Sequence, residues 1–104
     1  MTTRDESRVN KGAQIADTGW RLTLDLDVRL EYTDKSVVAT SPWVDDYGVG
    51  ESVEAAIQNL LLSLADFRES LERRSEKAQL SDELNDILSK LRILLHSNQP
   101  FTSS

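Results

Sequence analysis

The sequence predicts an α+β domain, with a small antiparallel sheet of about three strands, one long helix packed on it, and a second amphipathic helix. Two observations lead to this prediction. Across residues 20–33, hydrophobic side chains alternate with polar ones, which is the period of a strand with one buried face. From residue 52 onward, hydrophobic residues instead recur every three or four positions, as they do along one side of a helix.

The strands are expected in the first half of the chain. Residues 20–33 form the first strand, and after a short turn residues 36–41 form a second strand antiparallel to it. Pro42 ends the second strand because proline has no N–H to donate to a ladder. Residues 42–51 are less regular, and we expect a short third strand there before the first helix.

Two helices are expected in the second half, over residues 52–75 and 81–97, with Ser52 and Ser81 as their N-caps. The hydrophobic stripe of the second helix consists of Leu84, Ile87, Leu88, Leu91, Leu94 and Leu95. This stripe either packs beside the first helix or pairs with another subunit. Because the core looks small for the chain, we expect a homodimer or higher homo-oligomer, with this stripe as its interface.

The chain is too short for two domains, and its ends are polar. We therefore expect a disordered N-terminal tail at residues 1–19, one domain at 20–97 and a flexible tail at 98–104. The sequence has no cysteine, no signal-peptide pattern at its start and no apolar run long enough to span a membrane. These features predict a cytoplasmic protein that has no contact with membranes.

Acidic residues are concentrated in the predicted sheet. The formal net charge is −6, and residues 20–51 hold seven acidic side chains against three basic ones. Asp25, Asp27 and Glu31 share the polar face of the first strand. An acidic face repels phosphate backbones and attracts basic proteins, so we expect a basic protein partner and no direct contact with nucleic acid.

The sequence gives little support for catalysis. His96 is the only histidine and there is no cysteine, which argues against a zinc site and against a catalytic triad. The one enzymatic alternative is a metal-assisted nuclease in which Asp25 and Asp27 bind magnesium, as in ribonuclease H-like sites. A solvated strand face explains these two carboxylates better. We expect a protein that is not an enzyme and has no cofactor or bound metal.

Large aromatic side chains on an irregular loop beside a sheet are common anchors of protein interfaces. Trp43 and Tyr47 occupy such a loop, and Asp45 and Asp46 lie between them. The predicted protein interface consists of Trp43, Asp45, Asp46, Tyr47, Asp25, Asp27 and Glu31.

Residues 26–72 carry an ordered set of short motifs. These are Val37-Val38-Ala39 in the second strand, Ser41-Pro42 at its end, Tyr47-Gly48-Val49-Gly50 in the loop, and Gly50-Glu51-Ser52-Val53-Glu54-Ala55-Ala56-Ile57 at the start of the helix. With these motifs the chain resembles the HicB-like antitoxin domain. The resemblance implies a partial ribonuclease H-like fold that is not catalytic. It also implies that the chain neutralises a small protein toxin, often an RNA-cleaving one, by covering its active surface.

The second hydrophobic stripe leaves a different function open. A chain with more apolar helix surface than its sheet can cover is also expected of a self-associating scaffold or adaptor that has no toxin partner. The two hypotheses differ in whether the chain needs a second kind of protein to form its complex.

Overall fold

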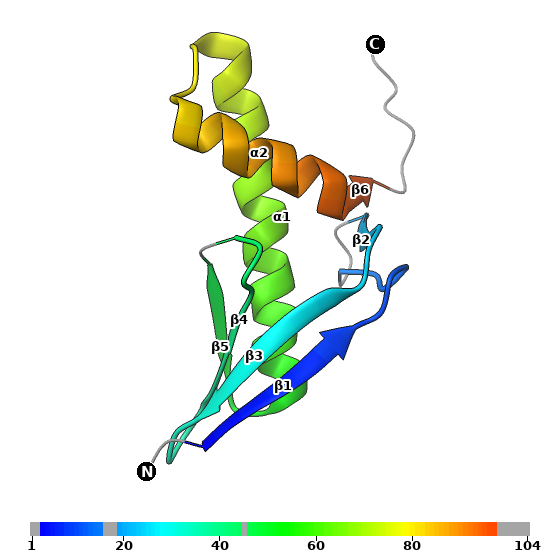
Figure 1. Ribbon diagram of the computed structural model, residues 1–104, viewed down its shortest axis with the longest axis vertical. Coiled ribbons are helices and arrows are strands. Elements are labelled where there is room, and N and C mark those ends of the chain that lie inside the picture. Colours follow the sequence, from blue (N-terminus) through cyan, green and yellow to red (C-terminus); the bar gives the residue numbers. More distant parts are fainter. Residues whose placement is uncertain (1–2, 16–18, 45, 98–104) are drawn as a thin grey trace.

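The structure is a computed structural model, and it describes residues 3–15, 19–44 and 46–97. In chain order the elements are β1 (Thr3–Val9), β2 (Trp20–Leu22), β3 (Leu26–Tyr32), β4 (Val37–Thr40), β5 (Tyr47–Gly50), α1 (Val53–Lys77), α2 (Asp82–Leu94) and β6 (Leu95–Ser97). The predicted α+β fold is confirmed. A four-stranded antiparallel sheet has the order β1-β3-β4-β5, and β2 pairs with β6 in a separate two-stranded sheet (Figure 1).

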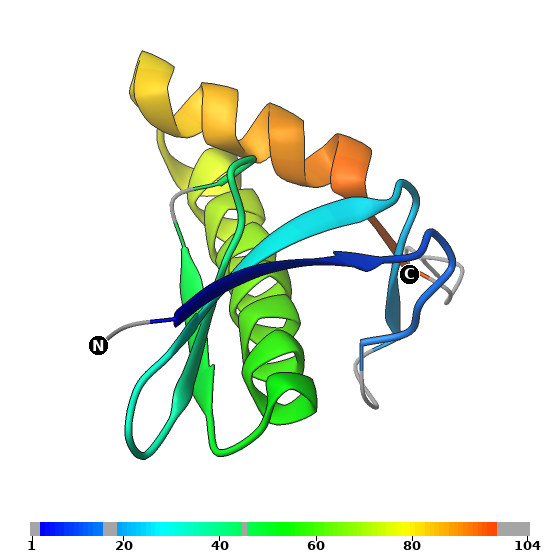
Figure 2. The ribbon, with the colours of Figure 1, turned by 60° about the horizontal axis from the view of Figure 1, so that its bottom comes forward.

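The long helix α1 covers one face of the four-stranded sheet. Leu26, Val28 and Leu30 of β3 are buried on this side, as the alternation in the sequence predicts. In the register of the sheet, Ala39 lies beside Leu30 and Gly48 lies beside Ala39. The opposite face has no second layer in the part of the chain that the structure describes (Figures 1 and 2).

Two glycines of β5 allow α1 to lie directly on the sheet. A Cβ atom on Gly48 would overlap the backbone of α1, with the Leu60 Cα only 2.7 Å away. A Cβ atom on Gly50 would lie 2.6 Å from the Ala55 Cβ. Gly48 and Gly50 are therefore required by the packing of β5 against the helix.

Both helices begin at the serines that the sequence predicts. The Ser52 Oγ accepts a hydrogen bond from the Ala55 N–H at 3.1 Å, and the Ser81 Oγ accepts one from the Leu84 N–H at 3.3 Å. Acidic residues occupy the first turn of each helix, where the helix dipole favours negative charge. Neither described helix is long and apolar enough to cross a bilayer.

The predicted strand at residues 20–33 is wrong as a single element. It is broken at residues 23–25, where the Thr23 N–H donates to the Leu94 carbonyl at 2.8 Å and the chain changes from β2 to β3. The second helix ends at Leu94 instead of residue 97, because Leu95–Ser97 form β6 and pair with β2. Both corrections have one cause, the small sheet that joins two distant parts of the chain.

The expectation of a disordered N-terminal tail is wrong for the described residues of that segment. All seven residues of β1 pair with β3, and the Ile15 side chain is fully buried. The segment was missed because β1 has polar side chains on both faces and so lacks an alternating hydrophobic pattern. Residues 1–2 and 16–18 of the predicted N-terminal tail, and the predicted C-terminal tail at 98–104, lie outside the described residues.

The stripe predicted as an oligomer interface lies mostly inside the chain's own core. Leu88, Leu91, Leu94 and Leu95 are buried there, and Leu84 and Ile87 are half-buried and packed against it. Of the two alternatives for this stripe, the structure has the first, in which α2 packs beside α1. The interface prediction was wrong because the packing of α1 and β6 against α2 could not be read from helical periodicity alone.

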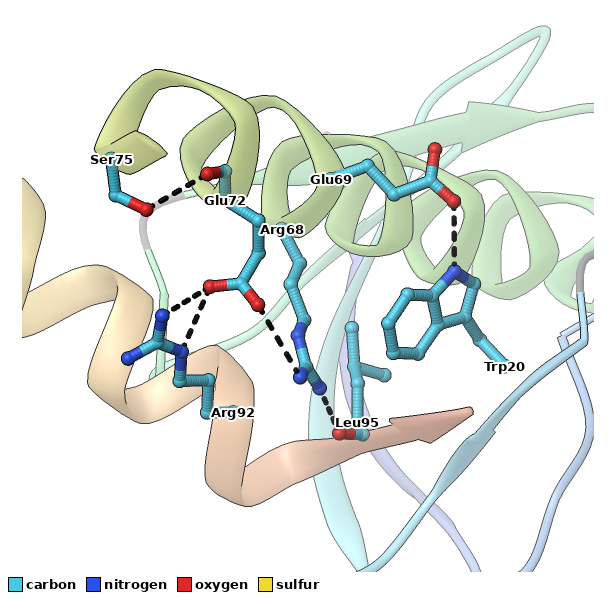
Figure 3. A network of polar contacts seen from close by, with 7 residues as sticks. All are labelled: Trp20, Arg68, Glu69, Glu72, Ser75, Arg92 and Leu95. Carbon is cyan, nitrogen blue, oxygen red and sulfur yellow. Dashed lines mark hydrogen bonds and ion pairs between the residues drawn. The ribbon is translucent and has the colours of Figure 1, made fainter. Parts of the chain in front are cut away.

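A clasp of polar contacts, formed by Trp20, Arg68, Glu69 and Glu72, fastens the two-stranded sheet to α1 (Figure 3). The Arg68 guanidinium stacks over the Trp20 ring at 4.6 Å, forms an ion pair with Glu72 at 3.9 Å and donates to the Leu95 carbonyl. The Trp20 Nε1–H donates to Glu69 at 3.0 Å. Burial lowers the pKa of Arg68, whose charge these contacts compensate.

The clasp predicts a loss of stability when Arg68 is replaced with lysine. An ammonium group keeps the charge but cannot stack in a plane on Trp20 while also bonding Leu95 and Glu72. We expect Arg68→Lys to lower the free energy of unfolding by about 1–2 kcal/mol in chemical denaturation. Arg73→Lys, at an exposed position on the same helix, is the matched control, and an equal effect of both changes would contradict this role.

Candidate protein-interaction site

The uncovered face of the four-stranded sheet has a charged half and a largely apolar half. Its side chains come from alternate positions of each strand: Arg4, Glu6 and Arg8 of β1, Asp27, Arg29 and Glu31 of β3, Val38 and Thr40 of β4, and Tyr47 and Val49 of β5. The charged half therefore belongs to β1 and β3, and the apolar half to β4 and β5. Figure 1 shows the order of these strands across the sheet.

We call Val38, Tyr47 and Val49 the apolar strip. Tyr47 is 63% exposed and Val49 is 43% exposed, and Val38 lies beside Val49 in the register of β4 and β5. Trp43, in the loop that leads to β5, is 36% exposed. Exposed aromatic and branched side chains that adjoin one another on a sheet are typical of a surface that another protein covers.

Side chains of α1 and of the preceding loop hold β5 in place. The Asp46 carboxylate accepts hydrogen bonds from the Tyr47 N–H at 2.8 Å and from the Ser63 hydroxyl at 2.7 Å. The Asn59 Nδ2 donates to the Val49 carbonyl at 2.6 Å. Because both ends of the strand are bonded in this way, the apolar strip is presented on a fixed backbone, which lowers the entropic cost of binding.

The charged half is balanced, unlike the acidic face that the sequence led us to expect. The Arg8 Nε donates to Asp27 at 2.9 Å, and Arg4 lies 3.6 Å from Glu31. The hydrogen bond and the negative charge of Asp27 raise the pKa of Arg8. The strand β1, which the sequence analysis left out of the sheet, supplies these basic side chains, so the face does not attract a partner by net charge.

The predicted interface residues are only partly brought together. Tyr47, Asp27 and Glu31 lie on the uncovered face, whereas Asp46 turns toward α1. Asp25 precedes β3 and accepts the Lys11 N–H at 2.7 Å. Trp43 lies in the loop before β5, and Asp45 lies outside the described residues.

Val38 and Val49 also belong to this surface, although they were not among the residues predicted for it. The alternation in β5, where Tyr47 and Val49 share one parity and Gly48 and Gly50 share the other, was the signal that could have found Val49. Val38 is less obvious, because it lies in an apolar run whose outward position depends on the pairing with β5.

The geometry gives no support to the alternative of a magnesium-dependent nuclease. Among the residues that the structure describes, no group of three His, Cys, Asp or Glu side chains is placed to hold a metal ion. Asp27 is paired with Arg8, and Asp25 caps the Lys11 amide, so each carboxylate has another partner. His96 is exposed on β6, opposite Arg21 of β2.

Comparisons of the chain with models of known protein families, with curated proteins and with solved structures find no match.

Proposed function

We propose that this chain is a non-catalytic protein-binding module of the cytoplasm, which acts as a HicB-like antitoxin by covering the active surface of a small protein toxin. The observation that carries this proposal is the apolar strip, which lies on a sheet face that none of the described helices and strands covers. A face of this kind supports binding to a protein better than any reaction that its side chains could perform.

The layout of the face supports a protein interface with an apolar centre and a polar edge. Tyr47 offers a large ring and a hydroxyl group for hydrogen bonding, which makes it a suitable central anchor. The charges of β1 and β3 lie to one side, and two ion pairs, Arg4–Glu31 and Arg8–Asp27, already join them. They fit the rim of an interface, where solvent-exposed ion pairs contribute little to affinity.

The region that resembles HicB-like proteins provides further support. Residues 26–72 form β3, β4, β5 and most of α1, so two strands precede a helix as the resemblance implies, although the residues that it assigns to a loop form β5. Gly48 and Gly50 of its motif lie where α1 packs so closely against β5 that a Cβ atom would overlap the helix. The toxin need not be strongly basic, because the face is balanced in charge, so the affinity should depend only weakly on salt concentration.

A substitution of Tyr47 tests the proposal. The chain is co-expressed with the product of each neighbouring gene, and the complex that forms is compared with the complex of the Tyr47→Ala variant. We expect the affinity to fall at least about 30-fold, as for loss of an interface anchor worth about 2 kcal/mol. The affinity is measured by isothermal titration calorimetry with the purified partner.

Ile93→Ala is the matched control, because Ile93 is also a large exposed hydrophobic residue, at 57% exposure, but lies on α2. This variant should bind with unchanged affinity. Binding that is weakened by Ile93→Ala and unaffected by Tyr47→Ala would contradict the proposed surface. A chain that binds no neighbouring gene product and only assembles with itself would favour the self-associating scaffold.

A further inference from the structure

The four-stranded sheet has two edges, and they differ in how many backbone groups remain available. At the β5 edge, Asp46 already bonds the Tyr47 N–H and Asn59 already bonds the Val49 carbonyl. Tyr47 and Val49 direct their backbone N–H and carbonyl groups away from β4, and another strand would need these groups to pair with β5. The β5 edge is therefore largely protected from further pairing.

The β1 edge is longer and less protected. Residues in an antiparallel strand alternately direct their backbone groups toward the neighbouring strand and away from it. The Glu6 N–H bonds the exposed Asp5 carboxylate at 2.8 Å, which places Glu6, and with it Arg4 and Arg8, among the outward residues. Within the described residues no other strand lies along this edge, and β1 forms the margin of the sheet (Figure 2).

The charges along β1 are arranged so that the strand complements a copy of itself. The outward residues read Arg4, Glu6 and Arg8, and their side chains all lie on the uncovered face. Two antiparallel copies that are centred on Ser7 place Glu6 of each copy opposite Arg8 of the other. The row across the junction then alternates in sign, from Arg29 and Glu6 of one copy to Arg8 and Asp27 of the second.

We propose that the β1 edge binds the β1 edge of a second copy of this chain, in an antiparallel pairing centred on Ser7 that joins the two sheets into one of eight strands. A two-fold axis through Ser7 makes the contact isologous, which is the commonest arrangement of homodimers. The Asp5 carboxylate turns away from the Glu6 N–H, which then donates to a carbonyl of the second copy. Asp5 is exposed, so water replaces its lost bond.

The charges favour this register over the registers centred on Glu6 and on Asp5. A pairing centred on Glu6 would set Glu6 against itself and Arg4 against Arg8, so every charged pair on the uncovered face would repel. A pairing centred on Asp5 would set two Asp5 carboxylates against each other on the opposite face. Only the Ser7 register places attractive pairs on the uncovered face and an uncharged pair at the axis.

This inference goes beyond the proposed function and is independent of it. The β1 edge and the apolar strip lie at opposite sides of the sheet order β1-β3-β4-β5, so a dimer leaves both apolar strips accessible. Dimerisation can therefore fail while the binding of a toxin succeeds, and the reverse can also occur.

The test is the mass of the purified full-length chain in solution, measured by light scattering at micromolar concentration. The unaltered chain should have twice the mass of one 11.7 kDa copy. Glu6→Arg and Arg8→Glu should each raise the dissociation constant more than about tenfold, because each change makes both junction pairs repulsive. An equimolar mixture of the two variants should recover the dimer, because arginine then faces glutamate at both pairs.

Arg4→Glu is the matched control. It removes an ion pair to β3, as Arg8→Glu does, but position 4 faces Asn10 of the second copy and should leave the dimer intact. A monomeric unaltered chain would overturn the proposal, as would dimers of Glu6→Arg or Arg8→Glu that remain intact. Dissociation caused by Arg4→Glu, or a mixture that remains monomeric, would overturn the Ser7 register. Far-ultraviolet circular dichroism establishes that each variant is folded.

Discussion

Gly48→Ala should be the most destabilising single-methyl change in this chain, lowering the free energy of unfolding by more than about 3 kcal/mol. The added Cβ would overlap the backbone of Ala56 and Leu60, and neither backbone segment can move without separating α1 from the sheet. A domain of this size has a free energy of unfolding of about 5–15 kcal/mol, so the variant loses a large share of its stability. Urea denaturation followed by circular dichroism measures the effect.

Gly12→Ala provides the comparison for Gly48→Ala. Gly12 has a φ of +91°, and a Cβ there would meet no atom within 4 Å. Alanine at this position carries only the strain of the backbone conformation, about 1–2 kcal/mol. If Gly12→Ala proved as costly as Gly48→Ala, close contact between β5 and α1 would not be the reason for the glycine in β5.

Leu91→Ala should lower the free energy of unfolding by about 2–5 kcal/mol without changing the oligomeric state of the folded chain. Leu91 is fully buried, and α2 packs against α1 within the same chain. Removal of its side chain leaves a cavity in the core, because the surrounding helices and the two-stranded sheet relax only in part. Thermal and urea denaturation measure the stability, and light scattering measures the mass.

Ile93→Ala is the control for Leu91→Ala, because it removes an exposed aliphatic side chain from the same helix. Its free energy of unfolding should change by less than about 0.5 kcal/mol. A Leu91→Ala chain that keeps its stability but dissociates into monomers would show that α2 is an oligomer interface after all, as the hydrophobic stripe alone had suggested.

The sequence predicts the elements with strong periodicity. The alternation in residues 26–32 and the helical spacing after residue 52 give β3, α1 and α2, and Ser52 and Ser81 mark where the helices begin. These features depend on local patterns, because burial of one face imposes the period of the element on its own residues.

The features that the sequence did not predict depend on contacts between distant residues. The strand β1 forms because its backbone pairs with that of β3. The hydrogen bond between Arg8 and Asp27 also joins residues 19 positions apart along the chain. The clasp between Arg68 and Trp20 likewise joins separate elements. Because β1 was missed, its arginines were not available to balance Asp27 and Glu31, and the sheet face was taken to be acidic.

In the candidate site, too, the residues found from the sequence depend on local features, and those that were missed or misplaced depend on contacts within the folded chain. Tyr47 was identified because large aromatic side chains on an irregular loop beside a sheet are common anchors of protein interfaces. Val49 shares the face of Tyr47 through the alternation within β5, whereas Val38 joins them only through the register of β4 and β5. The predicted acidic members are dispersed, because Asp46 turns to Ser63 and Asp25 turns to Lys11.

Hydrogen–deuterium exchange of the chain, alone and in complex with the partner that co-purifies with it, tests most directly whether the uncovered sheet face is the binding surface. We predict that the partner slows exchange in residues 37–50, which contain β4, β5 and the loop between them, and leaves residues 80–95 unchanged. Slower exchange confined to residues 80–95, with β4 and β5 unaffected, would place the partner on α2 and contradict the account.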